Sequence, residues 1–193
     1  MSAQPQLAPP GAGLPKPEAL IIRYLAFPLL RLKLTPKECF KLFAESGHEL
    51  LSLSQDLSLQ QLTTPILVKR LPGMEDSSRN WSMEETLEHI QIVSAGALYI
   101  ISKLEKGQKP AVEVRTQDVK PNGGLGLDRV RAFRDYLADL PNRLQPLTYS
   151  SKTTHHHPWF GPLPSLDWLR LLAFHQDLHR KQARLIAREL KKT

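Results

Sequence analysis

The sequence predicts an all-α fold: a four-helix bundle with long crossover loops and an extra N-terminal helix. Three observations carry this prediction. Apolar residues recur at helical spacing in four long segments, and two of these segments begin with a capping box. No segment shows the regular period-two alternation that is typical of a half-buried strand. The connections that join the helices include two long ones, as expected for a bundle with crossing connections.

The chain before the first bundle helix divides into two parts. Residues 1–17 are rich in Pro, Ala and Gln and lack the basic start and apolar run of a secretory signal, so we interpret them as a flexible tail. The domain itself then spans residues 18–193. The segment Ala19–Leu34 is apolar, but it is shorter than the roughly 20 residues of a membrane span and carries three cations, with Pro28 inside. We therefore expect this segment to form a kinked helix that packs on the domain or lies in a membrane interface.

The first two bundle helices have well-marked starts. Thr35 is placed to cap the first helix, which carries Pro36 at its first position and Glu38 in the capping box and extends to about Leu53. The second helix begins with the capping box Ser82-Met83-Glu84-Glu85 and extends to about Lys106. Between the two helices, Leu57–Asn80 is a long connection with a short turn after Ser58.

The other two bundle helices are separated by turn-forming residues. The third extends from Leu127 to about Leu140, where Pro141 and Pro146 limit its end. The last extends from Ser165, as its cap, to about Leu190. The connections before these helices are Gly107–Gly126, with two prolines and Asn-Gly-Gly, and Gln145–Pro164, with the run His155-His156-His157.

Composition and motifs limit the function classes. A chain of 193 residues with 41% hydrophobic and 23% charged residues suits one globular domain rather than a disordered chain. The single cysteine, Cys39, excludes an internal disulfide framework and fits a reducing compartment, so we expect a cytoplasmic protein. The net charge of +7 arises partly from basic residues in the last helix, where they complement its dipole. No nucleic-acid-binding motif is present, so we expect no nucleic acid as partner. Because Ala19–Leu34 is too short and too charged to span a bilayer, we expect no membrane partner either.

The histidines are the strongest chemical signal in the sequence. His175 and His179 are four residues apart on the inward face of the last helix, and Gln182 continues the same polar line. Two imidazoles inside a bundle need partners, and one divalent ion satisfies both. The alternative is a pair of surface histidines, or of core histidines bonded to carbonyl groups. His89, on the inward face of the second helix, would complete a three-histidine site with room for water or substrate.

Two stretches of the sequence resemble a known family. Trp81-Ser82-Met83-Glu84-Glu85-Thr86-Leu87-Glu88-His89-Ile90 resembles the signature of the second helix in the DinB/YfiT-like superfamily of metal-binding four-helix bundles. The His157–Leu163 segment, followed by Trp168 and His175-x-x-x-His179-x-x-Gln182, resembles the last-helix segment of that family. The resemblance covers about Thr35–Leu190. It implies that His89, His175 and His179 bind nickel, zinc or another divalent ion beside a pocket between the helices.

Three further residues are candidates for supporting or pocket roles. Glu85 lies one turn before His89 and would orient its ring, although helix capping explains this glutamate equally well. Gln182 follows the histidine pair by one turn. His157 either packs in its loop or folds back towards the pocket.

No phosphate loop, dinucleotide fingerprint, CxxC pair or Ser-His-Asp set is present, so any chemistry depends on the metal. We expect a metal-dependent enzyme with a small-molecule substrate. It would act either by hydrolysis or, as the resemblance implies, by S-transfer with a low-molecular-weight thiol as second cofactor. The alternative is a non-catalytic module, in which the metal stabilises a ligand-binding bundle or the basic last helix meets an acidic partner. We also expect a homodimer.

Overall fold

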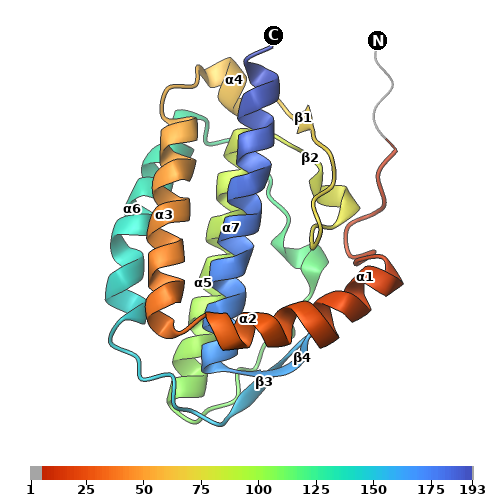
Figure 1. Ribbon diagram of the computed structural model, residues 1–193. Helices are drawn as coiled ribbons and strands as arrows, with labels where there is room; N and C mark the ends of the chain where they lie inside the picture. Colours follow the sequence, from red (N-terminus) through yellow and green to blue (C-terminus); the bar gives the residue numbers. More distant parts are fainter. Residues whose placement is uncertain (1–5, 193) are drawn as a thin grey trace.

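Four long helices form a bundle in the computed structural model, which describes residues 6–192 (Figure 1). Helices α3 and α7 run in one direction, and α5 and α6 run in the opposite direction. Helix α7 packs against α3 and α5, and α6 lies against the same two helices from the other side. The predicted all-α bundle is therefore confirmed. The bounds of the four helices are α3 Pro36–Ser54, α5 Met83–Glu105, α6 Leu127–Leu144 and α7 Ser165–Leu190.

The extra N-terminal helix lies across one end of the bundle (Figure 1). It consists of α1 (Lys16–Ile21), one π-helical turn (Ile22–Ala26) and α2 (Phe27–Lys33) without a break between them. Pro28 has no backbone N–H to donate, and the wider turn immediately before it is where the helix adjusts to that missing donor. Among residues 6–192, no helix combines the length and the apolar character needed to cross a bilayer.

The chain before this helix contacts the domain. The backbone N–H of Ala8 donates to Asp76 at 2.9 Å, and that of Gly11 donates to Glu75 at 3.4 Å. Residues 1–5, the start of the predicted flexible tail, lie outside the described residues. The contacts of Ala8 and Gly11 bring the rest of the tail onto the connection between α3 and α5.

Two helices begin with the predicted capping boxes, and a third begins with a box that was not predicted. Thr35 and Ser82 each form a complete capping box, with Glu38 in α3 and Glu85 in α5. The short turn expected after Ser58 is α4 (Leu59–Thr63), which has a capping box of its own. These boxes satisfy backbone N–H groups that a helix start would otherwise leave unpaired.

Two helix ends differ from the sequence prediction. Helix α6 passes Pro141 and ends at Leu144, because a proline in the last turn of a helix leaves only one carbonyl without its donor. Ser165 is the first residue of α7 rather than its cap, a position that Pro164 occupies. The Ser165 hydroxyl instead donates to Glu105 Oε1 at 2.5 Å, which joins the start of α7 to the end of α5.

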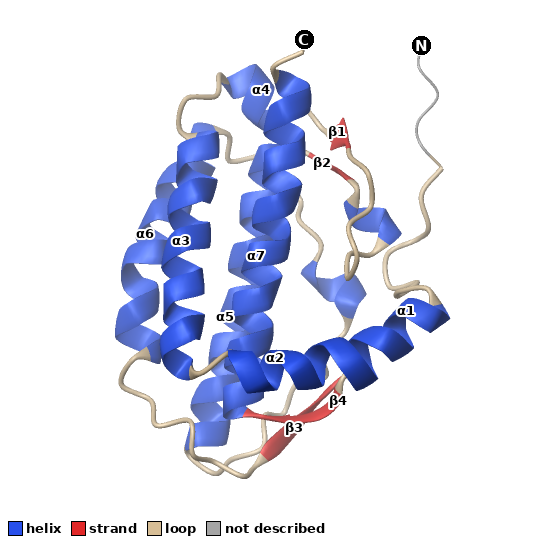
Figure 2. Ribbon diagram, in the orientation of Figure 1, coloured by secondary structure: helices blue, strands red, loops and turns tan. Residues whose placement is uncertain are grey.

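The connections contain two short hairpin pairings that the sequence did not predict (Figure 2). In the loop before α7, β3 (Thr154–His157) pairs antiparallel with β4 (Gly161–Pro164) in the register His157↔Gly161. The turn closes on Gly161, whose φ of +76° suits glycine. In the connection before α5, β1 (Ile66–Leu67) pairs with β2 (Asn80–Trp81). The connections also contain two 3-10 segments, Asp76–Ser78 and Thr116–Val119.

The apolar core forms two clusters along the bundle. One cluster lies near the hairpin of β3 and β4 and includes Phe27, Phe43 and Trp168. The other includes Leu50 and Phe133. Along α7, one cluster gives way to the other between Ala173 and Ala183, around the two predicted histidines; along α5, it does so between Ile90 and Ala97, just after His89. The bundle therefore has a polar layer between its two apolar clusters.

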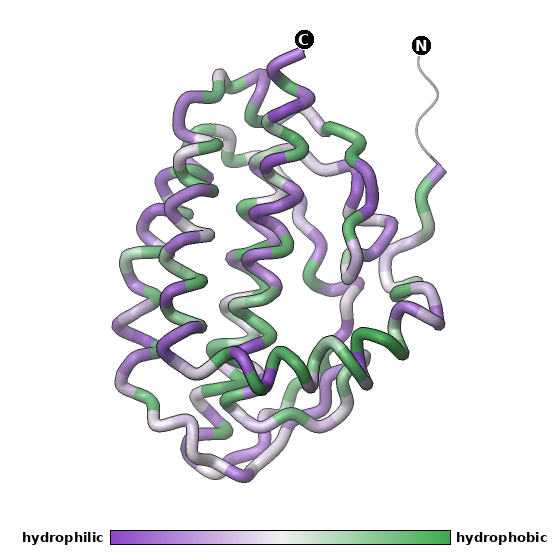
Figure 3. Tube along the Cα trace, viewed as in Figure 1, coloured by the Kyte–Doolittle hydropathy of each residue, from purple (hydrophilic) through white to green (hydrophobic). Residues whose placement is uncertain are grey.

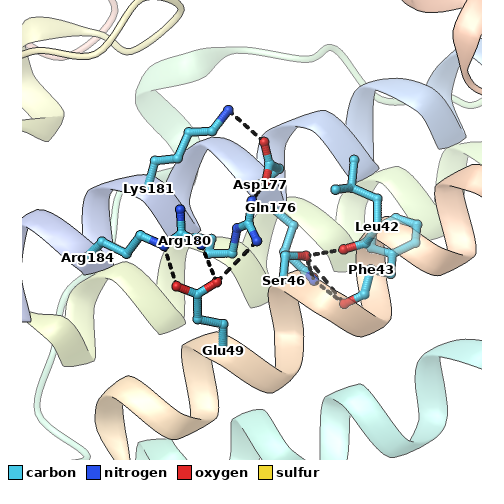
Figure 4. A network of polar contacts seen from close by, with 9 residues as sticks. All are labelled: Leu42, Phe43, Ser46, Glu49, Gln176, Asp177, Arg180, Lys181 and Arg184. Carbon is cyan, nitrogen blue, oxygen red and sulfur yellow. Dashed lines mark hydrogen bonds and ion pairs between the residues drawn. The ribbon is translucent and has the colours of Figure 1, made fainter.

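A polar network joins α3 to α7 (Figure 4). The Gln176 amide donates to Phe43 O at 3.0 Å and to Ser46 Oγ at 2.8 Å. Glu49 accepts from Arg180 and Arg184, and Asp177 pairs with Arg180 and Lys181. Much of the basic charge of the last helix is therefore neutralised within the chain.

Candidate metal centre

The three predicted histidines meet between α5 and α7. His175 and His179 lie on consecutive turns of α7, so their rings share one face of that helix, and His89 faces them from the second turn of α5. One ring nitrogen from each residue lies within 4.8 Å of the other two. The ring centroids are 4.5–4.9 Å apart. The three histidines could hold a metal ion.

The ring nitrogens have a spacing that suits ligands of one ion. His89 Nε2 and His175 Nε2 are 3.0 Å apart. Two nitrogens that each bind an ion at about 2.0–2.1 Å, with an angle of about 90–110° between them, lie roughly 3 Å apart. Trp81 packs against the cluster, with its ring centroid 4.7 Å from that of His89 and 5.7 Å from that of His179.

Two of the rings are oriented by hydrogen bonds on their outer nitrogens. His89 Nδ1 lies 2.6 Å from the carbonyl oxygen of Val119, which can only accept, so Nδ1 carries the proton. The neutral His89 ring therefore has its lone pair on Nε2. This arrangement, in which a carbonyl fixes the tautomer of a ligand, is typical of metal-binding histidines.

Gln182 fixes the tautomer of His179 in the same way. Its side-chain N–H donates to Ser78 O at 2.7 Å, which directs Oε1 towards His179 Nδ1, also at 2.7 Å. An amide oxygen accepts, so Nδ1 of His179 donates and Nε2 is left with a lone pair. The structure therefore places Gln182, one of the predicted supporting residues, in direct contact with His179.

Replacing Gln182 by Met is expected to weaken metal binding about 10- to 100-fold, because the His179 ring loses the acceptor that orients it. Calorimetric titration with zinc measures this change. Gln176→Met is the matched control, since Gln176 is equally buried on the same helix but bonds to Phe43 and Ser46. Equal affinities in the two variants would contradict the role of Gln182.

The surroundings keep the three imidazoles neutral. Burial lowers the pKa of His179 to about 4. Burial, followed by the effect of a positive charge on His179, lowers the pKa of His89 and of His175 well below the usual range. A neutral imidazole is the form that binds a metal ion. His175 Nδ1 is buried without a hydrogen-bond partner among the described residues.

The other predicted site residues are placed differently. Glu85 Oε2 accepts from the backbone N–H of Ser82 at 2.7 Å, so its carboxylate serves the capping box. His157 is buried, packs against Phe160 and Trp168, and lines the cavity that the three histidines also line. In the same run, His156 is exposed and His155 is half-buried.

The cavity beside the histidines has a volume of about 380 Å³ and mostly apolar walls. Its lining comes from several parts of the chain, including the N-terminal helix, the hairpin and the Gly107–Gly126 connection. Residues that contribute apolar surface include Ile22, Val93, Ala97, Val112, Phe160 and Leu171. Such a cavity fits an apolar small molecule.

A buried ion pair also lines this cavity. Lys120 Nζ donates to Glu75 Oε2 at 2.7 Å and to the hydroxyls of Ser77 and Ser78. It also lies 5.6 Å from the ring centroid of Trp81. Sequence reasoning missed this pair, together with Val119, because all of these residues lie in connections without periodicity or a known motif.

His157 is expected to make the protein less stable in mild acid. Burial lowers its pKa from 6.5 to about 3, so between these values the unfolded chain binds a proton that the folded chain does not. The free energy of unfolding therefore falls as the pH falls from about 6.5 towards 3. Urea unfolding at several pH values should show that the free energy of unfolding depends less on pH in His157→Gln than in the wild type. The exposed neighbour His156 provides the control, because His156→Gln should behave as the wild type does. If the free energy of unfolding changed equally with pH in all three proteins, the argument would be contradicted.

Comparisons with known proteins agree with this architecture. The TT2238 protein, a four-helix bundle of known crystal structure, is 22% identical to this chain and has a TM-score of 0.56. The match covers 78% of this chain and 98% of that protein, which supports the fold. No curated protein matches significantly. The family model of the DinB superfamily matches residues 42–183, from α3 into α7 and including all three histidines. The chain therefore belongs to the DinB superfamily.

Proposed function

We propose that this protein is a divalent-metal-dependent enzyme that transfers a small thiol to an apolar small molecule. His89, His175 and His179 would bind the metal, with nickel or zinc as the ion, because imidazole suits both. The observation that carries the proposal is the convergence of three neutral imidazoles at the wall of an apolar cavity. A divalent ion held by neutral ligands keeps its full charge and, when bound, lowers the pKa of a thiol or water beside it.

The residues of the chain would hold the site open on one side. Among residues 6–192, the group that could hold an ion contains three side chains, whereas a structural zinc site is normally closed by four. Val119 O and Gln182 fix two of the rings, and the apolar walls exclude water. These features favour an enzyme over a site that only stabilises the bundle.

Thiol transfer is favoured over hydrolysis by the state of the nearby carboxylates. Burial acts to raise the pKa of Glu75, but hydrogen bonds from Lys120 and others outweigh it and lower this pKa. Glu88 accepts from the backbone N–H groups of Asn122 and Gly123. Both carboxylates therefore have partners and are poorly suited to serve as the general base that hydrolysis commonly uses.

The proposed reaction forms a C–S bond and breaks the S–H bond of the thiol and the bond between the substrate carbon and its leaving group. The thiol loses its proton to solvent, and its sulfur forms a bond to an electrophilic carbon of the apolar substrate. The leaving group departs with the electron pair of the bond that breaks. A reducing compartment would supply the thiol, and we propose a cytoplasmic location, which also suits the free, buried Cys39.

The interaction-module alternative has less support. It depends on basic residues of α7 that are free to meet an acidic partner. Arg180, Lys181 and Arg184 instead pair with Glu49 and Asp177 within the chain (Figure 4).

The direct test combines the zinc- or nickel-loaded protein with a low-molecular-weight thiol and an apolar aryl halide, and measures halide release. We expect release that requires both metal and thiol and is lost in His89→Ala. His48→Ala, which replaces an exposed histidine of α3, should retain activity. Halide release that is independent of thiol, or activity in the metal-free protein, would contradict the proposal.

A further inference from the structure

The outer face of the N-terminal helix is an exposed apolar surface. Six large apolar side chains of this helix have exposed fractions between 47% and 82%. They are half of the twelve large hydrophobic residues that are exposed in the described part of the chain, and Figure 3 shows the helix as a run of apolar residues. We call this surface the outer face, and it consists of Leu20, Ile21, Tyr24, Leu25, Leu29 and Leu32.

Contacts on the inner side hold the helix in this orientation. Phe27 is buried and stacks on Phe160, with ring centroids 4.6 Å apart. Arg31 pairs with Asp167 of α7 at 2.7 Å, and Glu18 pairs with Arg70 at 2.5 Å. The helix is therefore fastened to the domain along its length, and the apolar side chains on its outer face point away from the core. Contiguous apolar surface of this kind marks an interaction site.

The charges on the N-terminal helix are predominantly positive. The helix Lys16–Lys33 carries four basic residues and one acidic residue. The acid, Glu18, pairs with Arg70, and Arg31 pairs with Asp167, which also pairs with Arg170. Lys16 and Lys33, at the two ends of the helix, are exposed and form no ion pair with a described carboxylate, and the same holds for Arg23 near its middle. The net charge of the outer surface of this helix is therefore positive.

We propose that the outer face docks on an anionic lipid membrane surface. An amphipathic helix lies in the interface when its apolar side chains enter the boundary of the acyl chains while flanking cations meet anionic headgroups. Such a helix need not span the bilayer, so its length and charges, which led us to expect no membrane partner, are compatible with this mode. A second copy of the chain fits less well, because outer faces packed against each other would bring like charges together.

The test is flotation of the full-length protein with lipid vesicles. We expect binding to vesicles that contain phosphatidylglycerol and little binding to vesicles of phosphatidylcholine alone. The double variant Leu25→Gln, Leu32→Gln should lose binding. Its control is Leu59→Gln, Leu125→Gln, which replaces two exposed leucines elsewhere and should bind as the wild type does.

The charge contribution is tested separately. The double variant Lys16→Gln, Lys33→Gln should reduce binding to anionic vesicles on the order of tenfold. Lys106→Gln, Lys109→Gln removes the same charge far from the helix in sequence and should have a small effect. Because all of these side chains are exposed, thermal unfolding should be unchanged in each variant.

Three outcomes would overturn the proposal. The first is a wild type that fails to bind anionic vesicles, and the second is a Leu25→Gln, Leu32→Gln variant that still binds them. The third is a wild-type dimer that this variant converts to a monomer in light scattering, which would make the outer face an interface between copies of the chain. None of these outcomes depends on bound metal, so the test is independent of the proposed function.

Discussion

Replacing His175 by alanine is expected to abolish stoichiometric metal binding. The wild type should hold about one divalent ion per chain, and the variant should bind at least about 100-fold more weakly, because two imidazoles replace three. His175 Nε2 lies 3.0 Å from His89 Nε2, so its ring is central to the cluster. Metal content after dialysis against zinc or nickel, followed by calorimetric titration, measures the effect.

The His175→Ala variant should remain folded, so that its loss of metal binding can be distinguished from unfolding. Among the described residues, the ring of His175 has no hydrogen-bond partner other than His89. Near-ultraviolet circular dichroism should therefore resemble that of the wild type. His48→Ala removes an exposed histidine and should retain the ion. A His175→Ala protein that still binds one ion tightly would show that the three-histidine site is wrong.

Replacing Gly96 by leucine is expected to close the cavity while leaving the metal site intact. Gly96 lies on α5 and lines the cavity, and a Cβ added there would meet no atom within 4 Å. The new side chain can therefore occupy space that a ligand would use. Glycine also destabilises a helix interior by roughly 0.5–1 kcal/mol relative to alanine, so the substitution should not destabilise the helix.

Two measurements check this expectation. Binding of an apolar fluorescent probe, and the proposed transferase activity, should each fall at least about tenfold in Gly96→Leu. Metal affinity should remain that of the wild type. Gly96→Ala is the control, because its single methyl group leaves most of the cavity free. If Gly96→Leu retained probe binding and activity, the cavity would not be the substrate site.

The convergence of the three histidines could be predicted because it depends on regular structure. His175 and His179 are one helical turn apart, and the apolar residues around them show which face is buried. His89 occupies the inward face of α5 for the same reason. Periodicity therefore predicts which side chains meet when two helices pack, without knowledge of the loops.

The rest of the site could not be predicted because it comes from the connections. Val119, Glu75 and Lys120 reach the cavity from segments whose course is set by individual hydrogen bonds. The hairpin that buries His157 has strands made of Thr, His, Gly, Leu and Pro, which show no clear apolar alternation. The orientation of the Ser165 side chain also depends on a partner that is distant in the sequence, Glu105. Tertiary contacts override local signals at these positions.

The N-terminal helix could likewise be predicted only in part. Its helical character and the disturbance near Pro28 follow from local sequence, and the structure has a helix with a π-helical turn there. Which side of this helix faces outward depends instead on Phe160, Asp167 and Arg70, which are distant in the sequence. The outer face could therefore be identified only from the packed structure.

X-ray absorption spectroscopy of the zinc- or nickel-loaded protein tests the central claim most directly. The structure predicts imidazole scattering from three nitrogen ligands at about 2.0–2.1 Å, with further light-atom ligands that exchange when a thiol is added. In His89→Ala, the imidazole contribution should decrease and the ion should be held weakly. A wild-type spectrum without imidazole scattering would contradict the assignment of His89, His175 and His179 as the metal centre.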